Sequence, residues 1–189
     1  VTLAPDRDGA RRPRPRSALY GNGQMRICIF GAGAVGSFLA ARLAQAGVDV
    51  SGGARGPHLA AIQRDGLRLQ ALDGEMTVRL PAAEDPAALG AQDLVIVSLK
   101  TPALAQAAAT MAPLLHAETA VAFALNGIFW FYGDGFAPQG TTPDTARLDR
   151  DGTLHRLIGA RRSLGMVVLS PNTLVAPGVV RNDRAGNAF

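Results

Sequence analysis

Three glycines at fixed spacing are the first residues in this sequence that could do chemistry. Gly31, Gly33 and Gly36 form the pattern Gly-x-Gly-x-x-Gly. In such a turn the first glycine permits a tight bend, the second lets the backbone approach a pyrophosphate, and the third allows a helix to pack closely on a strand. The residues between them are small or aliphatic: Ala32, Ala34 and Val35. We therefore expect residues 31–36 to bind the pyrophosphate of a dinucleotide.

The residues on either side of the glycines support this interpretation. Residues 25–30 have the apolar, β-branched character of a buried strand, and residues 34–46 place apolar side chains on one face of a helix. The N–H groups at the start of that helix would attract a phosphate. A glycine-rich turn without a ligand is the alternative, since the chain has 22 glycines. The strand before and the helix after favour dinucleotide binding.

The end of the second predicted strand, residues 48–53, indicates which dinucleotide. A site for NAD would place Asp or Glu there to bind the ribose hydroxyls. This sequence instead continues Ala54-Arg55. A guanidinium suits a 2′-phosphate, because its planar fork donates two parallel hydrogen bonds. We expect Arg55 to bind the 2′-phosphate of NADP(H); a solvated loop arginine is the alternative.

Two polar residues follow further predicted strands. Lys100, the single lysine of the chain, comes after residues 93–99, and Asn126 comes after residues 119–125. Ligands of open parallel sheets bind beyond the carboxyl ends of the strands. Lys100 could attract a phosphate or carboxylate there, and the Asn126 amide could hold the nicotinamide ribose or a substrate oxygen. A surface lysine and an ordinary Asn-Gly turn are the alternatives.

An aromatic segment follows Asn126. Half of the ten aromatic residues lie within residues 128–136, namely Phe129, Trp130, Phe131, Tyr132 and Phe136. Such a segment could line a pocket, but it more often packs on another domain or subunit. We expect self-association through Ile128–Phe136 to be possible.

Composition excludes several classes of protein. Cys28 is the single cysteine and there are three histidines, so we expect neither a disulfide framework nor a metal site. The net charge is +4, but residues 1–24 contribute +3 of it through five arginines and two aspartates. The remainder is nearly neutral, and this argues against nucleic-acid binding. No apolar run is long enough to span a membrane, and we expect a cytoplasmic protein.

The order of elements predicts the fold class. After a basic leader, 1–24, that we expect to be disordered, short apolar strands alternate with helical segments, including a helix over 103–115 and a strand over 165–169. This alternation is typical of an α/β protein with a mostly parallel sheet covered by helices. We therefore predict a Rossmann-like, doubly wound domain.

Taken in order along residues 25–182, these motifs resemble the N-terminal half of ketopantoate reductase (2-dehydropantoate 2-reductase). The resemblance depends on residues 31–36, Ala54-Arg55, Asp65-Gly66-Leu67, residues 97–101 (Val-Ser-Leu-Lys-Thr), Asn126-Gly127-Ile128 and residues 177–180 (Pro-Gly-Val-Val). Residues 129–132 also resemble an aromatic stretch of one branch of the family, with Phe129 where proline is expected.

The resemblance implies a function and a set of contacts. The family reduces 2-dehydropantoate to pantoate with NADPH, a step of pantothenate biosynthesis. It implies that residues 31–36 bind the pyrophosphate, that Arg55 binds the 2′-phosphate and that Lys100 lies along the cofactor. Asn126 would contact both cofactor and substrate, and Ser170 would contact the cofactor.

The resemblance also implies a second, all-helical domain that supplies a general-acid lysine and a substrate-binding carboxylate. We interpret residues 25–182 as the NADP-binding domain and residues 183–189 as a truncated tail, so we expect no catalytic residue in this chain and low activity alone. The alternatives are a reductase of another 2-keto acid or β-dicarbonyl, a non-catalytic NADP-binding module, and an interaction protein.

Overall fold

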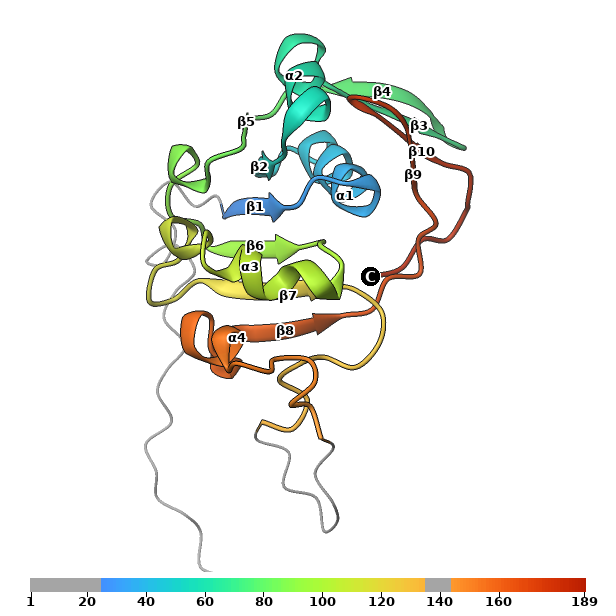
Figure 1. The fold of residues 1–189 in the computed structure, drawn as a ribbon. Helices are drawn as coiled ribbons and strands as arrows, with labels where there is room; N and C mark the ends of the chain where they lie inside the picture. Colours follow the sequence, from blue (N-terminus) through green and yellow to red (C-terminus); the bar gives the residue numbers. More distant parts are fainter. Residues whose placement is uncertain (1–24, 135–143) are drawn as a thin grey trace, which may run out of the picture.

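The computed structural model describes residues 25–134 and 144–189, in which a six-stranded sheet forms the centre (Figure 1). Its order is β5-β2-β1-β6-β7-β8, and every neighbouring pair is parallel. The strands are β1 (Arg26–Phe30), β2 (Asp49–Gly53), β5 (Ala82–Ala83), β6 (Leu94–Val97), β7 (Ala120–Ala124) and β8 (Ser163–Met166). This is the strand order of a doubly wound dinucleotide-binding fold, so the predicted fold class is confirmed.

Alternation along each strand divides the core between the two faces of this sheet. Ile27 and Ile29 of β1 belong to one buried cluster, whereas Cys28 and Phe30 belong to the other. Successive side chains of a strand point to opposite faces, and both faces here are apolar. The continuous apolar runs that the sequence shows therefore reflect a sheet covered on both sides.

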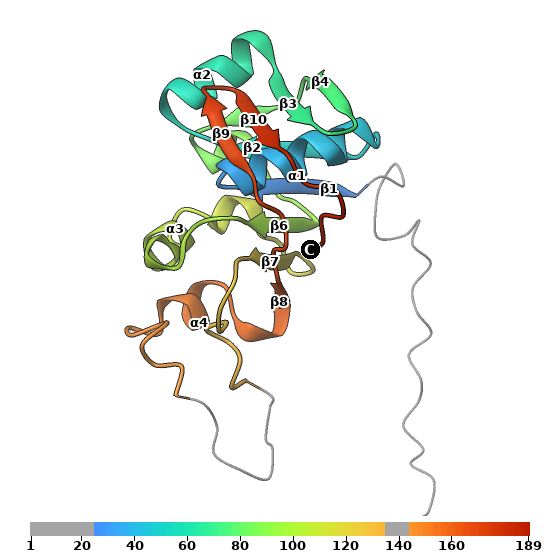
Figure 2. The ribbon, with the colours of Figure 1, turned by 90° about the vertical axis from the view of Figure 1, so that its right-hand side faces the viewer.

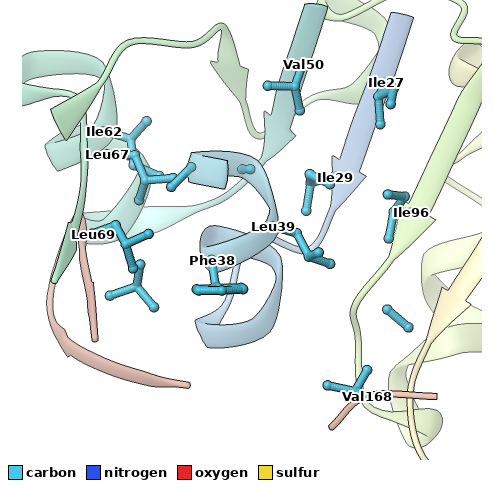
Figure 3. Packing of buried hydrophobic residues seen from close by; sticks show 14 of the residues in the cluster. Ile27, Ile29, Phe38, Leu39, Val50, Ile62, Leu67, Leu69, Ile96 and Val168 are labelled. Carbon is cyan, nitrogen blue, oxygen red and sulfur yellow. The ribbon is translucent and has the colours of Figure 1, made fainter. Parts of the chain in front are cut away.

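One face is covered by α1 (Ala34–Gln45), and α1 is covered in turn by a second sheet (Figures 1 and 2). That sheet has the order β4-β3-β10-β9, with strands β3 (Leu67–Ala71), β4 (Gly74–Val78), β9 (Thr173–Ala176) and β10 (Val179–Asn182). Figure 3 shows Leu67 and Leu69 of β3 on one side of Phe38, with β1 on the other side of the helix. The helix α2 (Gly56–Asp65) lies beside these strands.

The other face is covered by shorter elements. They are α3 (Leu104–Ala108), α4 (Thr153–Leu157) and the 3₁₀ turns η2 (Pro86–Ala88), η3 (Thr101–Ala103), η4 (Ala112–Leu114) and η5 (Ala160–Arg162). In Figure 2, α3 and α4 lie on the same side of the larger sheet. Within the described ranges, no helix has the length and apolarity that a membrane span requires.

The helix expected over 103–115 is much shorter in the structure. It ends at Ala108, and the next residues form a turn and then η4. Pro113 lacks an N–H group and disfavours helical backbone at the residue before it. The Thr110 hydroxyl also donates to the Ala107 carbonyl at 2.9 Å, so the end of this segment satisfies its polar groups locally.

The strand expected over 165–169 is displaced toward the N-terminus, since β8 covers Ser163–Met166. Beyond Met166 the partner of the chain is no longer strand β7. The Asn126 side chain bonds to the backbone of Val168, and Leu169 instead forms an isolated antiparallel bridge with Ala188. The predicted leader and Phe136 lie outside the described residues.

Candidate functional site

The predicted site residues that follow β1, β2, β6 and β7 lie at one edge of the larger sheet. From β1 the chain proceeds outward through β2 to β5, and it then returns to the other side of β1 as β6. The strands point to the same side in Figure 1. The reversal between β1 and β6 is a topological switch point, where doubly wound folds bind their ligands beyond the carboxyl ends of the strands.

The turn after β1 is held by backbone hydrogen bonds. The N–H groups of Gly31 and Ala32 both donate to the Gly53 carbonyl, at 3.2 and 2.8 Å, and Gly33 N–H donates to the Gly31 carbonyl at 2.7 Å. Gly31 has a φ of +98°, which L-residues with side chains rarely adopt. The turn is therefore tied to the end of β2 as well as to β1.

The three glycines are needed for different reasons. A Cβ at Gly31 would lie 2.5 Å from Leu99 Cδ2, and a Cβ at Gly36 would lie 2.5 Å from the Gly31 carbonyl oxygen. Packing within the chain thus requires these two glycines. A Cβ at Gly33 would meet no atom nearer than the Gly31 oxygen at 4.0 Å. The chain itself leaves this space open, as the close approach of a pyrophosphate to the backbone requires.

The start of α1 can hold an anion. Its N-cap is Gly33, and no side chain of the described residues caps the helix. The first N–H groups of a helix lack intrahelical partners and carry the positive end of its dipole. The N–H groups of Ala34 and Val35 are therefore available to phosphate oxygens, and pyrophosphate binding by residues 31–36 stays a prediction.

Ser98 supports the turn, and the sequence interpretation gave it no role. Its hydroxyl donates to the Gly31 carbonyl at 2.6 Å, and its N–H donates to the Phe30 carbonyl at 3.1 Å. The same Gly31 carbonyl accepts from Gly33. A hydroxyl directly after an apolar strand was the signal available, but only the neighbouring position of β1 and β6 shows its partner.

Arg55 lies at the start of α2, just beyond β2. It is the N-cap residue, with extended backbone angles, and its side chain is exposed. Among the described residues no acceptor pairs with its guanidinium. No carboxylate stands at the end of β2, whose one acid, Asp49, is its first residue. A free guanidinium at this place fits a 2′-phosphate.

Lys100 and Asn126 follow β6 and β7 at the same edge. Lys100 is exposed and precedes η3. The Asn126 amide spans the backbone of Val168: Nδ2 donates to its carbonyl at 3.0 Å, and Oδ1 accepts from its N–H at 2.8 Å. One N–H and one lone pair of the amide then remain for a ligand. Asn126 thus positions the chain after β8 whatever else it contacts.

Ser170 is separate from the turn and belongs to a polar cluster near the C-terminus. Its hydroxyl donates to Asn187 Oδ1 at 2.8 Å and accepts from the amide of Asn172 at 2.9 Å. Asn182, which is buried, also donates to this hydroxyl at 3.2 Å. The hydrogen-bonding capacity of Ser170 is therefore used within the chain, and its contact with a cofactor stays a prediction.

A hollow of about 330 Å³ lies at the opposite edge of the sheet, at the amino end of β2. Its walls include Ala44, Asp49 and Arg79. Within residues 25–134 and 144–189, this edge has no glycine-rich turn like that of residues 31–36, and ligands of such sheets bind at the carboxyl edge. We therefore assign the site to the carboxyl edge despite the size of this hollow.

Comparison with known proteins decides the family. Residues 27–129, more than half of the chain, match the family model described as ketopantoate reductase PanE/ApbA. The chain belongs to the ketopantoate reductase family. A 2-dehydropantoate 2-reductase of Mesorhizobium japonicum is 43% identical over 161 residues, which cover 84% of this chain and 49% of that protein.

Solved structures agree with this assignment. A ketopantoate reductase structure from Ralstonia solanacearum is 43% identical with a TM-score of 0.78, over 86% of this chain and 50% of that one. One from Ralstonia eutropha JMP134 is 30% identical with a TM-score of 0.65, over 84% and 46%. The chain thus spans about half the length of the ketopantoate reductases that it matches.

The aromatic segment of this family member packs inward for the most part. Trp130 is buried between Phe123 and His155, with ring centroids 5.8 and 4.6 Å away. Phe131 contacts the same Phe123 ring at 5.8 Å. The exposed apolar side chains are those of Ile128 and Tyr132. Self-association through Ile128–Phe136 stays a prediction.

His155 of α4 contacts this segment through Trp130, and its ring lies between two carboxylates. Its Nδ1 lies 2.7 Å from Asp149 Oδ2, and its Nε2 lies 2.8 Å from Asp134 Oδ2. Asp149 is buried and also accepts from the N–H groups of Leu154 and His155 at 2.9 and 3.0 Å. We call residues 129–132 with Asp134, Asp149 and His155 the aromatic clamp.

The charges of the aromatic clamp shift its pKa values. Burial is the largest single influence on the pKa of His155 and would lower it, but the hydrogen bonds and charges of Asp149 and Asp134 together raise it. Burial would likewise raise the pKa of Asp149, but the three hydrogen bonds that it accepts lower it. The doubly paired ring is thus favoured in its protonated form.

Proposed function

We propose that this chain binds NADP(H) and forms the coenzyme-binding half of a reductase that converts 2-dehydropantoate to pantoate. The observation that carries the proposal is the open space at Gly33, directly before the uncapped start of α1. Its place at the switch point of a ketopantoate reductase fold supports the same function. The reaction and the substrate come from relatives of about twice this length.

Each residue at the carboxyl edge has a separate task in this proposal. The N–H groups of Ala34 and Val35 bind the pyrophosphate, and the Arg55 guanidinium binds the 2′-phosphate. Lys100 supplies a positive charge along the coenzyme. The free N–H of Asn126 donates to the nicotinamide ribose or to a substrate oxygen. When bound, NADPH supplies the hydride that reduces the ketone carbon of the substrate.

Proton transfer to the substrate oxygen needs a group that we do not assign within this chain. Lys100, the one lysine of the sequence, is proposed to contact the coenzyme. A missing general acid lowers the rate by about 10²- to 10⁴-fold. We therefore expect coenzyme binding with poor or no turnover for these 189 residues.

Titration calorimetry with NADPH and NADH tests the proposal, with Arg55→Gln as a matched variant. The wild-type chain is expected to bind NADPH more tightly than NADH. Losing the guanidinium should weaken NADPH binding by at least about tenfold, since it removes charge-assisted hydrogen bonds to the 2′-phosphate, and leave NADH unchanged. If neither coenzyme gives a binding signal while circular dichroism shows a folded chain, the proposal is wrong.

Substrate choice needs a separate assay, because the alternative is a reductase of another 2-keto acid. NADPH oxidation by the chain should be followed with 2-dehydropantoate and a panel of 2-keto acids and β-dicarbonyls. Any residual rate should be highest with 2-dehydropantoate. A higher rate with another member of the panel would reassign the substrate but leave the coenzyme proposal intact.

A further inference from the structure

His58 connects three parts of the fold, although it lies outside the glycine-rich turn. It belongs to α2 and is partly buried. Its Nδ1 accepts a hydrogen bond from the N–H of Gly178, in the turn between β9 and β10, at 2.9 Å. Its Nε2 lies 3.1 Å from Oγ of Ser37, which is fully buried in α1.

The partners of the ring determine which nitrogen carries the proton. Since Gly178 N–H donates to Nδ1, that nitrogen has no proton, and a neutral ring then carries its proton on Nε2. Nε2–H donates to Ser37 Oγ, and the Ser37 hydroxyl donates to the Ala32 carbonyl at 3.0 Å. The hydrogen-bond chain therefore has one direction, from His58 through Ser37 to Ala32.

The chain ends on the backbone of the phosphate-binding turn. The Ala32 carbonyl and the Gly33 N–H belong to the same peptide group, and Gly33 N–H bonds to the Gly31 carbonyl at 2.7 Å. The peptide group between Ala32 and Gly33 is therefore held at both ends: the Gly31 carbonyl accepts from its N–H, and the Ser37 hydroxyl donates to its carbonyl. This peptide group directly precedes Ala34, so its tilt sets the direction of the first N–H groups of α1.

The other end of the chain is held by close packing of distant segments. Gly178 has a φ of +74°, and a Cβ there would lie 2.9 Å from the Cβ of Ala61 on α2. The turn between β9 and β10 therefore lies directly on α2 and presents its N–H to His58. Burial lowers the pKa of His58, which favours the neutral ring that can serve both partners.

We propose that His58 is a positioning residue for coenzyme binding, acting through Ser37 on the peptide group between Ala32 and Gly33. It orients the amides that bind the pyrophosphate, without touching the coenzyme itself. The inference rests on the proposed NADP(H) binding and adds to it a residue from outside the glycine-rich turn. It also makes the turn dependent on the second sheet, because Gly178, which is 120 residues further along the chain than His58, joins β9 to β10 of that sheet.

Two conservative variants separate the two hydrogen bonds of the ring. The amide nitrogen of Gln reaches about as far as Nε2, so His58→Gln keeps the donor to Ser37. The amide oxygen of Asn reaches about as far as Nδ1, so His58→Asn keeps the acceptor for Gly178. If His58 acts on the glycine-rich turn through Ser37, His58→Gln should retain coenzyme affinity. If His58 only anchors the turn between β9 and β10, His58→Asn should retain it instead.

The experiment measures Kd for NADPH and for NADH by calorimetry in the full chain and in each variant. His58→Asn and Ser37→Ala should weaken both coenzymes by the same factor of about five to ten, the effect of one lost hydrogen bond, because they share the pyrophosphate. His58→Gln should stay within about twofold of the wild type. Ser37→Ala combined with His58→Asn should add little to either change, since both break one chain. Urea unfolding of each variant establishes that it is folded.

The outcomes distinguish failure of this inference from failure of the proposed function. If the folded wild type binds neither coenzyme, the proposed function fails and the inference fails with it. If the wild type binds and His58→Asn binds equally well, the proposed function stands and His58 has no positioning role. A loss confined to NADPH would also overturn the inference, because it would mean that His58 contacts the 2′-phosphate directly.

Discussion

The glycine-rich turn, residues 31–36, and the aromatic clamp follow strands of the same sheet, but they are built in opposite ways. The turn after β1 consists of glycine, alanine and valine and is held mainly by backbone hydrogen bonds. The aromatic clamp after β7 consists of large rings and a histidine between two carboxylates. One region leaves space at Gly33, and the other fills its space with side chains.

The two regions differ in whether their residues are needed for folding or for binding. In the turn, two glycines are required by the chain and the third is not, so substitution there separates folding from binding. In the aromatic clamp, Trp130 fills the space between His155 of α4 and Phe123 of β7. We therefore expect substitutions in the clamp to change stability, and substitution at Gly33 to change ligand affinity.

Gly36→Ala tests the part of the turn that packing requires, and it should have the largest effect. The added Cβ would lie 2.5 Å from the Gly31 carbonyl oxygen and 2.8 Å from Ile29 Cγ2. Alanine normally favours a helix, but this contact should lower the free energy of unfolding by about 3 kcal/mol, the upper end of the usual cost of overpacking. Urea unfolding measures the change. Wild-type stability in this variant would show that the packing of α1 on β1 can relax.

Gly33→Ala tests the part that packing does not require. The added Cβ meets no atom within 4.0 Å other than the Gly31 oxygen at that distance, so stability should stay within about 1 kcal/mol of the wild type. NADPH binding should weaken by about 10- to 100-fold, because the methyl group occupies space proposed for the pyrophosphate. Calorimetry and urea unfolding of one preparation give both values. Unchanged affinity would contradict the assigned position of the pyrophosphate.

Asp149→Ala tests the buried side of the aromatic clamp, with Asp134→Ala as its control. Asp149 has a side chain only 2% exposed and accepts three hydrogen bonds, whereas the side chain of Asp134 is 40% exposed. Removing Asp149 should cost about 2 kcal/mol of stability, and removing Asp134 should cost less than about 1 kcal/mol. Equal costs for the two variants would mean that burial does not distinguish them. NADPH affinity should change in neither.

The smallest expected effect is a pH dependence of the clamp, measured as the difference in Tm between wild type and His155→Gln. The pKa of His155 is raised in the folded chain, so its contribution is complete below the ordinary pKa of 6.5 and is lost as the pH rises through the raised value. The pKa of Asp149 is lowered, so its contribution is lost only as the pH falls through that lower value. The Tm difference should therefore decrease from about pH 6 to about pH 9, a range that includes the usual pKa values of histidine. A difference that grows with pH would contradict the assigned charge of His155.

The turn could be predicted from the sequence because its determinants are local. Residues 31–36 carry both the bend and the helix start, and the strand and helix around them follow from hydrophobic period alone. The neighbours that require Gly31 and Gly36 do not follow from it. Ser98 and Leu99 directly follow β6, more than sixty positions further along the chain, and only the strand order brings them to the turn.

The pairing of β3 with β10 in the second sheet and the aromatic clamp could not be predicted for the same reason. Strand β10 pairs with β3 across more than a hundred residues, and neither segment shows a period that names its partner. Asp149 and His155 are six residues apart, and it is the start of α4 at Thr153 that brings their side chains together. The prediction of a long helix over 103–115 was wrong. It gave the alanine-rich composition more weight than Pro113, which disfavours a continuous helix.

The burial of Trp130 against His155 has a practical consequence. Trp130 is the one tryptophan of the sequence, so near-ultraviolet emission excited at its absorption band reports a single place in the molecule. Its indole lies edge-on to the imidazole at 4.6 Å, and a protonated imidazole quenches indole emission through electron transfer. The chain thus contains an intrinsic optical titration of that ring, which requires no dye and no engineered residue.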